Sequence, residues 1–170
     1  MGFFSRSEPS TTEEDKPFSL LAEELGLGFQ PSKRGFGPSI RGEVDGHRLK
    51  VAVAPGFRNE ISVKFNSGLN DLSIRSRSRN LRTNRVDVQT GDQTFDQHCR
   101  LLLRPTTDAA QVLEYLTPQR REIILALEQA FDLDEIEEGE LEVRFGETPS
   151  ADELREAISV VLLAATALDS

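Results

Sequence analysis

The spacing of apolar residues changes at Pro105, and this change constrains the fold more than any other feature of the sequence. From Ile40 to Arg104, apolar and polar residues alternate, which is the period of a β-strand with one buried face. After Pro105, apolar residues recur at the three- and four-residue intervals of a helix that buries one side. We therefore expect an α+β fold, in which helices cover one face of an antiparallel sheet.

The alternating segment predicts about six strands. Asp45-Gly46, Pro55-Gly56, Ser67-Gly68 and Gly91-Asp92 separate them, because these residues adopt the backbone angles of tight turns. The inward-facing sets are Ile40 and Val44; Leu49, Val51 and Val53; Ile61, Val63 and Phe65; Leu72 and Ile74; Val86 and Val88; and Cys99, Leu101 and Leu103.

Helices are predicted over residues 17–25, 108–116, 118–131 and 151–168. Thr107 and Thr117 are suitable N-caps for the second and third helices. Ser150, followed three residues later by Glu153, forms the capping-box pattern that opens the last helix.

The last helix is apolar on nearly every side. From Ala157 onward, Ser159 and Thr166 are its only polar residues before Asp169. Such a helix needs cover on more than one side, and a second copy of the chain could supply it. We therefore predict an oligomer interface on the side away from the core, formed by Val160, Leu163 and Ala167.

Residues 133–145 predict an acidic hairpin that turns at Glu138-Gly139, with apolar residues facing inward. Its carboxylates then form a solvated face. Burial is what raises the pKa of a carboxyl group toward the value that a general acid needs at neutral pH, so we expect no such group here. The carboxylates concerned are Asp132, Asp134, Glu138, Glu140 and Glu142.

Residues 1–16 are rich in Ser, Thr, Glu and Pro and predict a disordered arm, whereas residues 17–170 predict a single domain with a possible sub-boundary near residue 105. No apolar run approaches the roughly 18 residues of a membrane helix. The single cysteine, Cys99, excludes an internal disulfide and a zinc site made of several thiolates. With no signal peptide in the sequence, we expect a cytoplasmic protein.

Charge is unevenly distributed along the chain. The total is −9, but residues 1–32 carry −4, residues 33–104 carry +7 and residues 105–170 carry −12. Alternation places many of the basic side chains on the polar face of the predicted sheet. The candidate interaction face consists of Arg75, Arg77, Arg79, Arg48, Lys50 and Lys64.

An acidic surface is the expected partner of this basic face, either the acidic part of the same chain or another protein. Nucleic acid or an anionic membrane surface is the alternative, because both present phosphates. Residues 66–94 contain no aromatic side chain on which a base could stack, so nucleic acid is not favoured.

Two segments resemble a group of uncharacterised bacterial proteins: GEVDGHRLKVAVA at residues 42–54 and TGDQTFDQHCRLLLRPTTDAAQVLEYLTPQRREIILAL at residues 90–127. These proteins share a TGD-x-x-FD turn, a strand and then a Leu-Thr-Pro helix. The resemblance implies a bacterial α+β domain. No catalytic residue is established for the group, so the resemblance assigns none to this sequence.

Asp92, Asp96, His98 and Cys99 bring carboxylates, an imidazole and a thiol together in the sequence. A metal site or a Cys–His nucleophile could use these groups. However, His98 and Cys99 are consecutive on a predicted strand, so their side chains should point to opposite faces. We favour a structural role, with Asp92 fixing a turn, Phe95 filling the core and Cys99 acting as a small core residue.

Other routes to catalysis lack their residues. The sequence contains neither a G-x-S-x-G elbow nor a G-x-x-x-x-G-K-[ST] phosphate loop, and Gly35-Phe36-Gly37 does not follow a strand. His47 is expected at a strand end, and the sequence has no third His and no second Cys that could join it in a metal site. We therefore expect no catalytic residue, no cofactor and no metal.

The sequence favours a non-enzymatic, cytoplasmic protein-interaction or structural module that associates with itself or with another protein. A binder of nucleic acid or of an anionic membrane surface, acting through the Arg-rich sheet face, is the alternative. An enzyme of an unrecognised kind ranks third.

Overall fold

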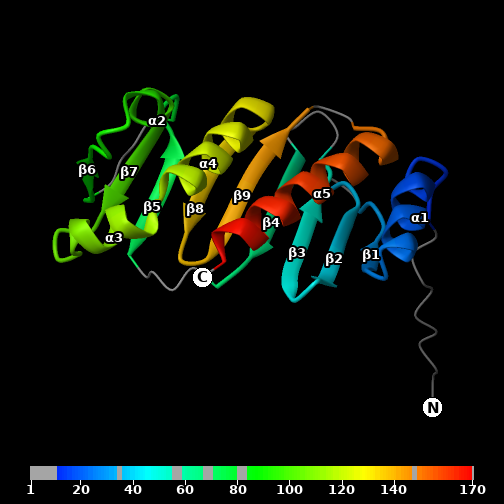
Figure 1. Cartoon of the computed structure of the whole chain (residues 1–170). Helices are drawn as coiled ribbons and strands as arrows, with labels where there is room; N and C mark the ends of the chain where they lie inside the picture. The colour runs from blue at the N-terminus through cyan, green and yellow to red at the C-terminus, as the bar shows by residue number, and fades with distance from the viewer. Residues whose placement is uncertain are drawn as a thin grey trace, which may run out of the picture.

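Nine strands of the described chain form one antiparallel sheet in the computed structural model (Figure 1). The structure describes residues 11–33, 36–54, 59–66, 71–79, 84–146 and 149–169. In chain order the elements are α1 (Lys16–Glu24), β1 (Gly28–Gln30), β2 (Ser39–Val44), β3 (His47–Ala52), β4 (Asn59–Lys64), β5 (Leu72–Ser76), β6 (Val86–Val88), α2 (Gln93–His98), β7 (Cys99–Leu103), α3 (Ala109–Tyr115), α4 (Pro118–Ala130), β8 (Asp132–Glu137), β9 (Glu140–Phe145) and α5 (Ala151–Leu168).

The predicted α+β class is confirmed, and the sheet has more strands than the six predicted between residues 40 and 104. Those six are β2 to β7. The acidic hairpin contributes β8 and β9 to the same sheet, and β1 adds a short edge strand next to β2.

The acidic hairpin lies at the centre of the sheet. The strand order is β1-β2-β3-β4-β9-β8-β5-β7-β6, so β9 pairs with β4 and β8 pairs with β5. The hairpin therefore joins two groups of strands that precede it in the sequence. The one sheet thus contains strands from both sides of residue 105.

Local backbone signals act as predicted at several positions. Asp45 and Gly46 turn between β2 and β3 with positive φ angles of 50° and 84°. Ser150 and Glu153 form the predicted capping box at the start of α5. The N-cap of α3, however, is Asp108 and not Thr107, because the Asp108 carboxylate accepts a hydrogen bond from the Ala110 amide at 2.9 Å. The predicted turns at Pro55-Gly56 and Ser67-Gly68 lie outside the described residues.

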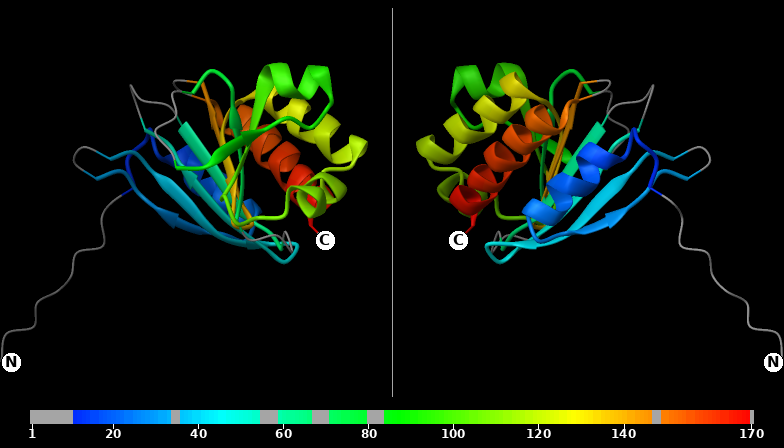
Figure 2. Two further views of the ribbon diagram at one scale, coloured as in Figure 1. Left: turned by 90° about the vertical axis from the view of Figure 1, so that its left-hand side faces the viewer. Right: turned by 90° about the vertical axis from the view of Figure 1, so that its right-hand side faces the viewer.

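Helices cover one side of the sheet (Figure 1; Figure 2), and the core lies between these two layers. Alternate strand residues such as Ile61, Val63 and Leu141 are fully buried beneath the helices. The inner side of α5 adds a second buried set, which consists of Leu154, Ala157, Ile158, Val161, Ala164, Ala165 and Leu168. No helix in the described chain is both long enough and apolar enough to cross a membrane.

The described chain begins inside the predicted arm. Asp15 is 2% exposed, and its carboxylate accepts hydrogen bonds from the Ser32 amide at 2.9 Å and the Ser32 hydroxyl at 2.5 Å. These bonds fix the start of α1 against the segment that follows β1. Residues 1–10, which make up most of the predicted arm, lie outside the described residues.

Candidate functional site

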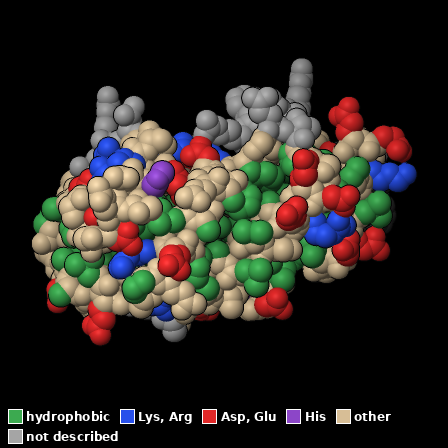
Figure 3. Space-filling view, turned by 45° about the horizontal axis from the view of Figure 1, so that its top comes forward, with side chains coloured by type: hydrophobic (Ala, Val, Ile, Leu, Met, Phe, Trp, Pro, Cys, Tyr) green, Lys and Arg blue, Asp and Glu red, His purple; other side chains and the backbone are tan. Residues whose placement is uncertain are grey.

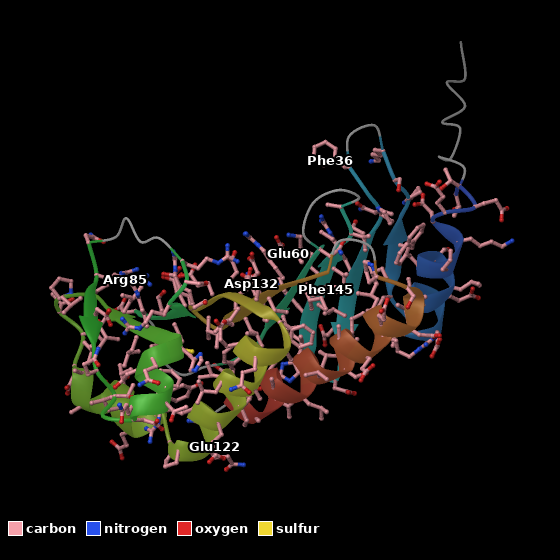
Figure 4. All side chains as sticks on the ribbon, turned by 90° about the horizontal axis from the view of Figure 1, so that it is seen from above. Phe36, Glu60, Arg85, Glu122, Asp132 and Phe145 are labelled. Atoms are coloured by element: carbon pink, nitrogen blue, oxygen red, sulfur yellow. The ribbon has the colours of Figure 1, made fainter. Side chains whose placement is uncertain are left out.

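The sheet face away from the helices, which we call the open face, carries the charged side chains of alternate strand positions. In Figure 4, Glu60, Arg85 and Asp132 lie on this side, whereas Glu122 of α4 lies on the helical side. Glu60, Ser62 and Lys64 alternate with buried residues along β4, which places them on the open face. The same alternation places Glu140, Glu142 and Arg144 beside them on β9.

Carboxylates face one another across the acidic hairpin. Glu135 lies opposite Glu142, and Glu137 lies opposite Glu140. Like charges in directly opposed positions destabilise a sheet, so this pairing needs positive charge nearby. On one flank Lys64 Nζ lies 3.4 Å from Glu140 Oε2, and on the other Arg75 donates two hydrogen bonds of 2.7 and 2.6 Å to Glu135. The basic strands thus neutralise the acidic hairpin from both sides.

Five of the six residues of the predicted interaction face form ion pairs on the open face or at its rim. Arg48 is the exception: it is exposed and forms no ion pair with another described residue. The five pairings are Lys50–Glu60 at 2.9 Å, Lys64–Glu140 at 3.4 Å, Arg75–Glu135 at 2.5 Å, Arg77–Asp87 at 3.9 Å, and Arg79 with both Asp132 and Asp134 at 3.1 Å. Much of the basic face is therefore engaged by carboxylates of the same chain.

The expectation that no hairpin carboxylate has a raised pKa is wrong for Glu142. Burial raises the pKa of Glu142 from 4.5 to about 7, and a hydrogen bond with Asp134 and the charge of Glu60 add to the rise. The central position of the hairpin is the cause, because strands on both sides remove water from its carboxylates. Arg144, whose Nη2 lies 2.6 Å from Asp134 and 3.7 Å from Glu142, opposes the rise in part.

A basin of about 420 Å³ lies over this part of the open face. Its lining residues are all charged: Lys64, Glu135, Glu137, Glu138, Glu140 and Glu142. Ligand pockets are mostly apolar with a few polar groups, so this lining is unlike that of a small-molecule site. Within the described ranges, no group of three or more His, Cys, Asp or Glu residues is arranged to hold a metal ion.

The TGDQTFD segment forms the start of a helix, where a turn leading into a strand was predicted. Asp92 is the N-cap of α2 and accepts hydrogen bonds from the Thr94 and Phe95 amides, both at 3.1 Å. The bond from the Phe95 amide is the main cause of the lowered pKa of Asp92. Asp96 accepts hydrogen bonds from the Thr90 amide at 3.0 Å and the Gly91 amide at 3.1 Å. Both carboxylates therefore hold the backbone in place.

His98 and Cys99 are separated by the end of this helix and do not share a strand. His98 is the last residue of α2 and is exposed, whereas Cys99 begins β7 and is 1% exposed. Burial raises the pKa of Cys99 to about 12, so the thiol stays protonated and is a poor nucleophile. Phe95 is fully buried, as predicted.

His47 lies at the start of β3 and is 5% exposed. Its Nε2 lies 3.2 Å from the Thr166 hydroxyl on α5, which in turn donates to the Leu162 carbonyl at 2.9 Å. This contact joins β3 to α5 and gives a structural role to Thr166, one of the few polar residues of that helix.

The outer side of α5 exposes an apolar stripe, formed by Val160, Leu163 and Ala167. Leu163 is 71% exposed and Val160 is 39% exposed. The spacing of three and four residues places all three on one side of the helix, opposite the buried set. The structure thus brings together the three residues predicted for an oligomer interface.

A groove beside this stripe was not predicted. It lies between the ends of α4 and β9 and the first turns of α5 and has a volume of about 420 Å³. Phe131 and Phe145 meet there edge to face, with ring centroids 6.4 Å apart. The register of the hairpin, in which Asp132 pairs with Arg144, brings the two rings together, and residues of α5 form the other wall of the groove.

Comparison with known proteins identifies a fold. No family model matches the chain, and no curated protein matches its sequence. The crystal structure of the mycobacterial trehalose monomycolate transport factor A, TtfA, is similar, with a TM-score of 0.63 over 90% of this chain and 93% of that chain. The two sequences are 10% identical, so the similarity concerns the fold. Over nearly its whole length, the chain therefore shares the architecture of a transport factor.

Proposed function

We propose that this chain is a non-enzymatic, self-associating protein-interaction module that works in the cytoplasm, with the α5 stripe as its homotypic surface. The observation that carries the proposal is the exposure of Leu163, which is 71%, in the middle of a helix whose other side forms the core. A large apolar side chain with apolar neighbours on an outer helix face is typical of a protein interface. A second copy would bury the stripe against itself about a two-fold axis.

The fold similarity supports a role as an accessory part of an assembly. The similar structure is named as a transport factor. We infer by analogy that this chain also serves a transport assembly by binding its components, and that residues 17–170 act as one unit. The proposed role agrees with the TGD-x-x-FD segment, whose carboxylates cap and brace the backbone.

Nucleic acid and anionic membranes are weaker candidates for the open face. A phosphate would have to displace carboxylates that already pair with cations of this face. These cations are Lys50, Lys64, Arg75, Arg77 and Arg79. Arg41 and Arg48 are exposed and form no ion pair with another described residue, but two cations supply little of the charge that phosphate binding requires.

Light scattering after size-exclusion chromatography, over a range of protein concentrations, tests the proposal. The wild type should form a dimer as concentration rises, and Leu163→Glu should remain a folded monomer because a charge cannot be buried in the apolar interface. Leu20→Glu is the matched control, since Leu20 is also an exposed leucine on a helix, at 58%. A wild type that stays monomeric at every concentration would show that the chain does not self-associate.

A further inference from the structure

The groove at the junction of α4, β9 and α5 has an apolar floor. Its volume of about 420 Å³ falls within the range of about 300–1,000 Å³ that is typical of ligand pockets. Hydrophobic side chains are exposed in this region, with acidic ones beside them (Figure 3). The apolar lining residues are Ala130, Phe131, Phe145, Pro149, Ala157 and Val160.

The rim of the groove is acidic. Glu153 and Glu156 are the charged residues among the described ones that line it, and none of these is basic. Hydrogen bonds from Ser150, the stronger from its amide at 2.7 Å, lower the pKa of Glu153, which stays ionised. Glu156 forms no ion pair with any residue that the structure describes. The nearby Arg155 does not neutralise the rim, because its guanidinium is held by Glu24, at 2.7 Å, and by Asp152.

We propose that this groove binds a segment of a partner protein in which an apolar side chain is flanked by lysine or arginine. The apolar side chain would fill the space between Phe131, Phe145 and Val160, where contact with aromatic rings and exclusion of water supply most of the binding energy. The flanking cations would face Glu153 and Glu156, which fixes the orientation of the segment and excludes acidic competitors. The site needs no second copy of the chain, although Val160 lines the groove and also belongs to the α5 stripe.

Binding of a synthetic helical peptide to the full chain tests this assignment. The labelled peptide has leucine at positions i, i+3, i+4 and i+7 and lysine elsewhere, and fluorescence anisotropy measures its affinity. We expect saturable binding that weakens as salt screens the charges. A peptide with glutamate in place of every lysine should not bind. No saturable binding of the lysine peptide, or equal binding of both peptides, would overturn the proposal.

Two variants locate the binding site. Ala130→Trp places a large ring in the groove and should abolish binding, whereas Ala126→Trp, which is also exposed on α4 but does not line the groove, should not. Glu156→Lys should weaken binding about fivefold, since it replaces an exposed attractive charge pair with a repulsive one. If circular dichroism shows that Ala130→Trp does not fold, the affinity of Glu156→Lys for the peptide tests the proposal instead. Unchanged affinity in the folded variants would contradict the proposal.

Further variants separate this groove from other occupants and from the α5 stripe. Leu163→Gln removes the leucine of the stripe without adding charge, and it should weaken self-association but leave peptide binding intact. Loss of peptide binding in this variant would place the peptide on the stripe. The chain's own N-terminus contains Phe3 and Phe4, followed by Arg6, and so resembles the proposed partner segment, in which an apolar side chain is flanked by a cation. Tighter peptide binding after Phe3→Ser and Phe4→Ser would assign the groove to the chain's own N-terminus and overturn the partner proposal.

Discussion

Glu142 shows how the position of a residue in the sheet decides its chemistry. In the sequence it is one of several carboxylates on an alternating hairpin, and alternation alone predicts a solvated side chain. In the sheet it lies between Ser62 on one strand and Glu135 on the other, with Asp134 and Glu60 close enough to raise its pKa. The charged form of Glu142 is therefore held in the folded state at a cost in free energy.

Glu142→Gln should stabilise the protein at pH 8. The pKa of Glu142 in the folded chain, about 7, lies above its ordinary value of 4.5, so the folded state binds this proton more tightly than the unfolded state. The stability of the wild type should thus rise as pH falls from above 7 toward 4.5, and this rise should be smaller in the variant. After allowance for partial exposure, we expect a gain of about 1 kcal/mol at pH 8, or about 2–4 °C in Tm.

Thermal melts of both proteins between pH 4.5 and pH 8 measure this effect. Glu138→Gln, at the exposed turn of the same hairpin, is the control and should change Tm little. Equal melting temperatures of wild type and Glu142→Gln at pH 8 would show that the carboxyl group is not destabilised by its surroundings.

At the scale of elements, the acidic hairpin and the arginines around it depend on one another. Arg75 and Arg79 each contact carboxylates of β8, and Arg77 lies near Asp87 of β6. Their side chains are only partly exposed, at 33%, 24% and 34%, so these contacts are screened less than surface ion pairs.

Changing Arg75, Arg77 and Arg79 together to alanine should lower the stability of the fold. We expect a loss of about 2–4 kcal/mol, because partly buried carboxylates of β8 would lose their partners. Chemical denaturation measures the loss. A mixed-sequence DNA or RNA titration at low salt should show no tight binding by the wild type. Unchanged stability together with loss of tight nucleic-acid binding in the variant would favour the alternative function.

The spacing of apolar residues predicts a strand or helix that keeps one period over several residues. It does not predict short elements. The alternation of Leu49, Val51 and Val53 is enough to predict β3. By contrast, β1 has three residues in a segment rich in glycine and proline, and α2 has six residues that read as a turn. The place of the hairpin could not be predicted, because the pairing of β9 with β4 is set by packing between distant segments.

The same limit applies to the candidate sites. The stripe of Val160, Leu163 and Ala167 depends on helix spacing, so the sequence predicts it. The ion pairs of the open face depend on strand order, which the sequence does not reveal. The groove at Phe145 depends on where α5 packs beside the end of the predicted hairpin, and this packing is not revealed by the sequence either.

For the whole molecule, the central position of β8 and β9 predicts that the strands before residue 105 are not stable without them. A chain that ends at Arg104 would lack both central strands and the helices α3, α4 and α5 that cover the core. We expect this fragment to show no cooperative unfolding transition in circular dichroism, whereas the full chain should show one. A cooperative transition of the fragment would mean that strands before residue 105 are stable without the hairpin.

The position of the hairpin also affects the order of events during synthesis. Asn59 and Phe145 lie side by side on β4 and β9 but are 86 positions apart in the chain. While the ribosome is still producing the helices, β4 and β5 each have an edge with no neighbour, and such edges readily pair with other chains. We expect the nascent protein to be most prone to aggregation in this interval and to rely on chaperones until β9 emerges and closes the sheet.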